Sequence, residues 1–142
     1  MNAELEWLKG MTFVVRSGSG HRVVMDTKSE GGGENSAPSP MENVLMALLG
    51  CTAVDVIAIL KKKKLRFSRL QVLAEAERAA DHPRVFTSVT LVYRLFGDKS
   101  AASALKAAVA LSQEKYCSVS AMVRKTAKLD YSLEVVPDAE AV

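Results

Sequence analysis

Histidine and cysteine are scarce in this chain of 142 residues, which holds two of each. His21 stands beside a glycine-rich turn and His82 precedes Pro83, and neither has a second candidate ligand at metal-site spacing. We therefore expect no zinc site and no hydrolase built on Ser-His-Asp or Cys-His groups. Glycine motifs that cradle nucleotides are also missing after the predicted strands. No metal and no organic cofactor is expected.

Charge is modest, with a formal net charge of +3, but one run is strongly basic. Residues 61–69 hold six Lys or Arg residues and no acid. The run follows a long apolar helix, where cations oppose the negative end of the helix dipole. A nucleic-acid or membrane patch is the alternative, which the lack of an accompanying aromatic-rich strand disfavours. We expect neither nucleic acid nor a membrane as a partner.

Targeting signals are not expected. The N-terminus has no basic segment followed by an apolar stretch, so no secretory signal is predicted. Residues 44–60 are nearly all apolar, but Asp55 interrupts them and Glu42 precedes them, which favours a buried helix over a membrane span. A cytoplasmic location follows as an expectation, and it would keep the two thiols reduced.

The length and the 49% apolar composition predict one domain over residues 1–142. Its expected parts are an N-terminal hairpin and loop (1–38), a long helix (39–61), a second hairpin (70–96), and two helices with a last strand (98–136). Within them we expect strands near 11–16, 21–26, 70–78, 85–95 and 129–136, and an acidic tail. We also expect a helix that is capped by Asp98 or Ser100 and runs to about 115, and a short helix from 118 to about 127. This order predicts an α+β fold in which an antiparallel sheet packs on helices.

The long helix has the clearest start signal in the chain. Ser39 is a capping residue, Pro40 suits the first helical position, and Glu42 completes a capping box. From Val44 to Val54 the helix is apolar on every face, so it must be covered on all sides. One sheet covers one side only, which predicts a second copy of the chain on the other.

The two cysteines have unequal surroundings. Cys51 lies inside the apolar helix, where a cysteine is by default a small core residue and needs a cation or hydrogen bond to ionise. Asp55, one turn later on the same face, opposes a thiolate there. Cys117 stands at the predicted start of a short helix, whose amides and dipole lower the pKa of a thiol. A packed cysteine at a helix junction is the alternative for Cys117.

Two segments, Ser39–Glu42 leading through Gly50-Cys51-Thr52 and later Glu114–Val119, together resemble the OsmC/Ohr superfamily, most closely its YhfA-like branch. The resemblance covers nearly the whole chain. It implies an OsmC-like α+β fold and an intertwined homodimer in which sheets wrap around two long central helices. It also implies thiol-dependent reduction of organic hydroperoxides. Cys51 would attack the O–O bond, Cys117 would resolve the sulfenic acid as a disulfide, and an external dithiol would reduce it.

The activating groups of that family carry over less directly. In the hydroperoxidase branch an arginine and a glutamate activate the first cysteine, and the glutamate directly follows the proline before the helix. Met41 holds that position here and Glu42 comes next, about 100° further round the helix. Arg16 or Arg22 of the first hairpin would supply the cation, and we take Arg16 with Glu42 as the candidates. The displaced Glu42 keeps an alternative open: a non-catalytic dimer that binds a small apolar ligand or senses thiol redox state.

Overall fold

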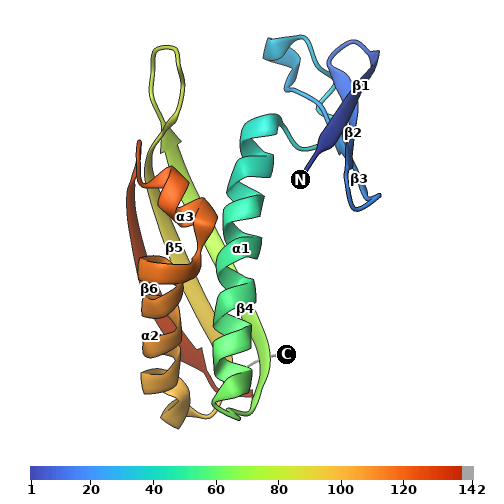
Figure 1. Cartoon of the computed structure of the whole chain (residues 1–142). Helices are drawn as coiled ribbons and strands as arrows, with labels where there is room; N and C mark the ends of the chain where they lie inside the picture. The colour runs from blue at the N-terminus through green and yellow to red at the C-terminus, as the bar shows by residue number, and fades with distance from the viewer. Residues whose placement is uncertain (139–142) are drawn as a thin grey trace. The chain divides into compact units, whose positions relative to one another are not determined.

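The structure is a computed structural model that describes residues 1–138 and divides into two compact units. The first covers residues 1–46 and the second begins at Ala47 (Figure 1). The single domain expected over residues 1–142 stays a prediction, and residues 139–142 of the expected acidic tail lie outside the described residues.

The N-terminal unit is built on a three-stranded antiparallel sheet in the order β1-β2-β3. Its strands are β1 (Ala3–Lys9), β2 (Thr12–Ser17) and β3 (Arg22–Met25). The β2–β3 hairpin confirms the hairpin expected from the sequence, with Val14 opposite Val24. Strand β1 was not predicted. None of its seven residues is buried, so it lacks the half-buried pattern by which a strand is recognised in a sequence.

A buried carboxylate anchors the loop after β3. Asp26 is fully buried, and its side chain accepts hydrogen bonds from the backbone N–H groups of Thr27, Glu34 and Ser36 at 2.7, 3.2 and 2.9 Å. The Ser36 hydroxyl donates a further bond at 2.7 Å. The loop includes the short helix η1 (Ser29–Gly31). These four bonds give the polar, glycine-rich segment a fixed path toward the long helix.

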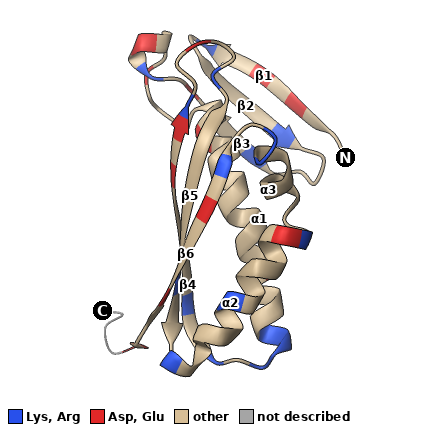
Figure 2. Ribbon diagram, turned by 90° about the vertical axis from the view of Figure 1, so that its left-hand side faces the viewer, with Lys and Arg blue, Asp and Glu red and all other residues tan. Residues whose placement is uncertain are grey.

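The long helix is α1 (Pro40–Lys62), and its predicted start is confirmed. The Ser39 N–H donates to Glu42 Oε2 at 2.7 Å, and the Glu42 N–H donates to Ser39 Oγ at 3.3 Å. This is the reciprocal pattern of a capping box. At the other end Lys61 and Lys62 stand in the last turn, where cations oppose the helix dipole (Figure 2).

The C-terminal unit contains a second three-stranded sheet, in the order β4-β5-β6. After α1 its elements are β4 (Phe67–Arg78), β5 (Phe86–Gly97), η2 (Lys99–Ala101), α2 (Ala102–Leu111), η3 (Ser112–Tyr116), α3 (Ser118–Val123) and β6 (Lys128–Val136). The β4–β5 hairpin is antiparallel, as expected, and Asp98 accepts a bond from the Ser100 N–H at the start of the helical segment.

The expectation of a purely antiparallel sheet is wrong. Strand β6 pairs with β5 in parallel, from Ser88 opposite Lys128 to Phe96 opposite Val136. Between these strands the chain runs through α2, η3 and α3, and a parallel pair needs a long crossover connection of this kind. The α+β class stands, with two small sheets in place of one and a mixed second sheet.

The core of the C-terminal unit lies between this sheet and the helices. On β5, Val89, Leu91, Tyr93 and Leu95 alternate along the strand and are almost fully buried. Helices α1, α2 and α3 lie on the same side of the sheet (Figures 1 and 2). The buried residues of α2 include Leu105, Ala108 and Val109. The middle strand therefore presents one continuous face to the helices.

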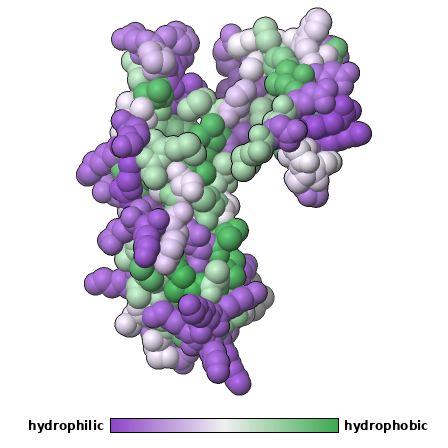
Figure 3. All heavy atoms as spheres, viewed as in Figure 1, coloured by the Kyte–Doolittle hydropathy of each residue, from purple (hydrophilic) through white to green (hydrophobic). Residues whose placement is uncertain are grey.

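Helix α1 buries one stripe and exposes the rest. Its buried residues recur every four positions, at Leu48, Thr52, Val56 and Leu60. Val54 is 68% exposed, and Figure 3 shows apolar atoms at the surface on the α1 side of this unit. The sequence predicts that α1 is covered on all sides. Within one chain, only the side that carries these four residues is covered. By length and composition alone α1 is also the one described helix that could cross a membrane.

Candidate functional site

The structure brings the two thiols together. Cys51 is half-buried on α1, and Cys117 is 3% exposed at the residue that precedes α3. Both are free thiols, and the Cys51 side chain lies near enough to the Cys117 side chain to raise the pKa of the Cys117 thiol. Two cysteines that are far apart in sequence are thus near each other within the C-terminal unit.

Burial decides the protonation of Cys117. It raises the pKa of the Cys117 thiol, and the neighbouring Cys51 thiol adds to the rise. Cys117 is the N-cap of α3, and its sulfur accepts a hydrogen bond from the Ser120 N–H at 3.4 Å, which opposes the rise. The predicted lowering by the helix N-terminus is therefore wrong in net direction, because the loss of water outweighs one amide donor.

A polar cluster, buried except for the half-buried Asp55, adjoins the segments that carry the thiols. We call it the hydroxyl cluster, and it consists of Thr52, Asp55, Tyr93, Ser112 and Gln113. Thr52 Oγ1 lies 2.7 Å from the Tyr93 hydroxyl oxygen and 2.8 Å from Ser112 Oγ. Ser112 Oγ donates to Asp55 Oδ2 at 2.9 Å. The Gln113 amide donates to the Tyr93 hydroxyl at 2.8 Å.

Tyr93 links the cluster to the site electrostatically. Burial raises the pKa of Tyr93 to about 12, against hydrogen bonds from Thr52 and Gln113, and the charge of a Cys117 thiolate adds to the rise. Tyr93 is therefore a neutral hydrogen-bonding group at neutral pH. On the far side of the cluster, Arg124 donates to Gln113 Oε1 at 3.1 Å.

The hydroxyl cluster was not predicted. Its members come from α1, β5 and η3, and Thr52, Tyr93 and Ser112 are each fully buried. Single hydroxyl residues in apolar segments carry no spacing signal, since only the fold shows that they meet. One weak indication was available: buried polar residues need partners, and Thr52 and Asp55 stand in an apolar helix.

Glu42 has a structural task in the N-terminal unit. Hydrogen bonds from the Ser39 hydroxyl and backbone hold the pKa of the exposed Glu42 carboxyl below its usual range. Both oxygen-to-donor contacts are short, 2.6 Å to Ser39 Oγ and 2.7 Å to Ser39 N. The capping interpretation of Glu42 is confirmed, while a role toward Cys51 stays a prediction.

Arg16 also lies in the N-terminal unit, on β2. Its guanidinium is 3.8 Å from Glu6 Oε2, in an ion pair whose side chains are both substantially exposed. Arg22, the other candidate, stands opposite Arg16 in the β2–β3 ladder. Both arginines therefore belong to a different unit from the thiols, and an activating role for either stays a prediction.

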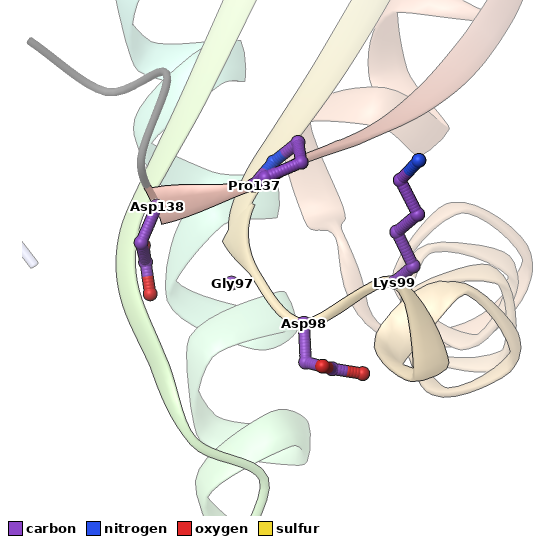
Figure 4. Close-up of a pocket in the computed structure, with 5 residues that line it drawn as sticks. All are labelled: Gly97, Asp98, Lys99, Pro137 and Asp138. Atoms are coloured by element: carbon purple, nitrogen blue, oxygen red, sulfur yellow. The ribbon is translucent and has the colours of Figure 1, made fainter.

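Several cavities lie on the surface of the C-terminal unit. One of about 460 Å³ is lined by Gly97, Asp98, Lys99, Pro137 and Asp138, none of which is a predicted site residue (Figure 4). Another of about 530 Å³ includes Gln113 and Arg124, the edge of the hydroxyl cluster. No group of three metal-binding side chains occurs among residues 1–138.

The class of protein follows from its α+β fold, with two small sheets and helices, together with two neighbouring free thiols: it is an OsmC-like protein. The family model described as OsmC-like protein matches residues 32–132, and the chain belongs to this family. It is 42% identical to "Protein YhfA" of Escherichia coli strain K12 over 136 residues, which are 96% of this chain and 98% of that protein. The resemblance noted in the sequence is thereby confirmed.

Solved structures show the same fold. A hypothetical protein from Aquifex aeolicus VF5 is 33% identical, with a TM-score of 0.81 over 96% of both chains. An organic hydroperoxide resistance protein OsmC from Legionella pneumophila is 20% identical, with a TM-score of 0.72 over 94% of this chain and 96% of that one. The mixed α+β fold thus matches OsmC-like structures.

Proposed function

We propose that this protein reduces organic hydroperoxides with Cys51 as the attacking thiol and Cys117 as the resolving thiol. The observation that carries the proposal is the proximity of these two side chains in the C-terminal unit. Membership of the OsmC-like family and the hydroperoxide resistance protein among its structural neighbours support it.

The proposed reaction has two steps. The Cys51 thiolate attacks the O–O bond, the bond breaks, and the departing oxygen leaves as an alcohol after taking a proton. Cys51 is then a sulfenic acid. The Cys117 thiolate attacks the Cys51 sulfur, the S–O bond breaks, and water leaves once hydroxide has taken a proton. An external dithiol reduces the disulfide and restores both thiols.

The electrostatics favour this order of events. A Cys51 thiolate raises the pKa of Cys117, so the two thiols do not ionise together readily. Once Cys51 is a neutral sulfenic acid, that charge is gone and Cys117 ionises more easily. The resolving thiol therefore becomes reactive at the stage that needs it.

Thiolate formation at Cys51 requires a cation, and we propose Arg16 for it. Glu42 is the candidate carboxylate to orient this arginine, but its hydrogen bonds within the capping box favour a structural role alone. The substrate would be a small apolar hydroperoxide, and the working form a homodimer around the α1 helices. We also propose a cytoplasmic location, which would keep both thiols reduced between turnovers. The proposal involves no metal, organic cofactor, nucleic acid or membrane.

One observation favours a second candidate function. The Glu42 carboxylate is already bound within the capping box, which leaves it less free to hold an arginine. A dimer that senses thiol redox state, or that binds a small apolar ligand without turnover, needs no such carboxylate. In that case the thiols would oxidise slowly and stoichiometrically.

Peroxide consumption separates the two functions. With cumene hydroperoxide and excess dithiothreitol, the proposed enzyme consumes many equivalents of peroxide per protein, and Cys51→Ser abolishes consumption. Cys117→Ser slows it, because external thiol must then resolve the sulfenic acid. Met122→Ala, at an exposed position of α3, serves as the control that retains activity. Stoichiometric consumption by the unaltered protein would favour the sensor.

A further inference from the structure

Ser112 joins the two segments that carry the thiols. It is fully buried at the start of η3, a π-helical turn that leads to Cys117. Its carbonyl accepts the Cys117 N–H at 2.8 Å, and its hydroxyl lies 2.8 Å from Thr52 Oγ1. Thr52 follows Cys51 directly. One residue therefore connects the backbone of Cys117 to the helix turn that holds Cys51.

We propose that the buried hydroxyl pair of Thr52 and Ser112 positions the Cys51 and Cys117 thiols for disulfide formation. The inference rests on the proposed use of these thiols, and its test needs no peroxide chemistry. Both residues act through the cysteines and touch no substrate, so they are positioning residues.

The direction of each hydrogen bond in the cluster is fixed. Asp55 accepts from Ser112, so the single hydroxyl proton of Ser112 is used. The Thr52 hydroxyl must then donate to Ser112, and the Tyr93 hydroxyl must donate to Thr52. The hydroxyl protons of Tyr93, Thr52 and Ser112 therefore all point toward Asp55, and only this one assignment of donors and acceptors is possible. Such a chain holds its members in a single geometry.

The π-helical turn η3 brings this hydrogen-bonded link next to Cys117. A π-turn inserts an extra residue into a helical segment, costs stability and is frequent at functional sites. Here it follows α2 and ends at Cys117, whose backbone is extended with φ −70° and ψ 102°. The Thr52–Ser112 link fixes the turn against α1 at the level of Cys51. Thiol geometry matters because a disulfide forms only over a narrow range of distances.

The reduction potential of the thiol pair is the measurement. In a glutathione buffer the Cys51–Cys117 S–S bond forms as the S–S bond of glutathione disulfide breaks, and both protons and two electrons go to two glutathione thiols. A loss of stability shared by the oxidised and reduced protein leaves this potential unchanged. Poorer thiol placement destabilises the disulfide alone.

Six proteins are compared: the unaltered chain, Ser112→Ala, Thr52→Val, Thr52→Ser, the double variant Ser112→Ala/Thr52→Val and a control. Ser88→Ala is the control, since Ser88 bonds Glu77 at 3.2 Å on the same sheet, apart from the cluster. We expect each of Ser112→Ala and Thr52→Val to lower the disulfide equilibrium constant about tenfold, or about 30 mV in potential. Thr52→Ser keeps the hydroxyl and stays within about twofold of the unaltered protein.

The double variant completes the test. Because both residues form one link, the double change is expected to shift the constant no more than either single change. Shifts below twofold in both single variants would overturn the inference, as would equal losses for Thr52→Ser and Thr52→Val. An unaltered protein that forms no disulfide in oxidising buffer would also overturn it. A normal disulfide without peroxide turnover would contradict the proposed function alone.

Discussion

Burial raises the pKa of two groups of the candidate site, Cys117 and Tyr93. Desolvation is the first cause of the raised pKa in both, and hydrogen bonds oppose it only in part. The helix N-terminus at Cys117 was a sound reason to expect a lowered pKa. What the sequence does not give is the number of water molecules that the folded chain removes from the thiol. Protonation at this site therefore follows from packing.

Asp26 leads to a prediction about acid stability. Hydrogen bonds, first of all from Ser36, lower the pKa of Asp26 to about 2. A lowered folded-state pKa gives stability that is present above the unfolded value of about 3.9 and is lost as the pH falls toward 2. We expect the melting temperature of the protein to fall over this range.

Asp26→Asn provides the check. The neutral amide cannot carry this pH dependence, so the variant should melt lower at pH 7 and lose less between pH 4 and pH 2. Circular dichroism melting at several pH values measures both effects. Parallel curves for the two proteins would show that the loop anchor contributes nothing to acid stability.

Among the helices and strands, the features set by residues close together in the sequence were predicted correctly. The capping box at Ser39 and Glu42, the β4–β5 hairpin and the helix-capping Asp98 were all predicted, because each depends on residues close in sequence. The direction of β6 was missed because it depends on how far α2 carries the chain back along the sheet. Strand β1 was missed because it is exposed throughout.

In the candidate site, too, the residues within local motifs were predicted, and the residues that meet only in the folded chain were not. The two cysteines were predicted from motifs, and their contact was implied by the family resemblance. Thr52, Tyr93 and Ser112 were not predicted, because they meet only after β5 and η3 have packed on α1. The π-turn that carries Ser112 has no sequence signature of its own.

The capping box at the start of α1 can be tested by substitutions at Glu42 and Ser39. Glu42→Gln keeps an acceptor for the Ser39 N–H, so we expect the melting temperature and the rate of Cys51 oxidation to remain close to those of the unaltered protein. Ser39→Ala removes the cap and should cost about 1 kcal/mol of unfolding free energy. Chemical denaturation and stopped-flow peroxide kinetics measure the two quantities.

A different outcome would reassign Glu42. If Glu42→Gln lowered the oxidation rate tenfold or more while the melting temperature stayed constant, about 1.4 kcal/mol of transition-state stabilisation would be lost. The carboxylate would then belong to the catalytic groups, and Arg16 would be the first residue to test beside it.

For the whole molecule, the uncovered side of α1 predicts an obligate homodimer. Val54 is 68% exposed and Met46 45% exposed on a helix that is apolar over most of its length. Interfaces of obligate dimers bury about 2,000 Å² or more and resemble a core cut in half. Sedimentation equilibrium at micromolar concentration should therefore show a dimer and no folded monomer.

Val54→Glu is the matched variant for this prediction. A carboxylate in an apolar dimer interface should dissociate or unfold the protein. Gln71→Glu, at an exposed position of β4 opposite Arg94, introduces the same group and should leave the dimer intact. A stable monomer of the unaltered chain, or a dimer of Val54→Glu as stable as that of Gln71→Glu, would contradict the interface.

Hydroperoxide should drive Cys51 and Cys117 into a disulfide within one chain. Mass spectrometry after treatment with one equivalent of cumene hydroperoxide detects this disulfide. We expect the loss of two hydrogen atoms per chain and a peptide pair linked between Cys51 and Cys117. Free thiols that persist under excess peroxide, or a linkage found only between chains, would contradict it.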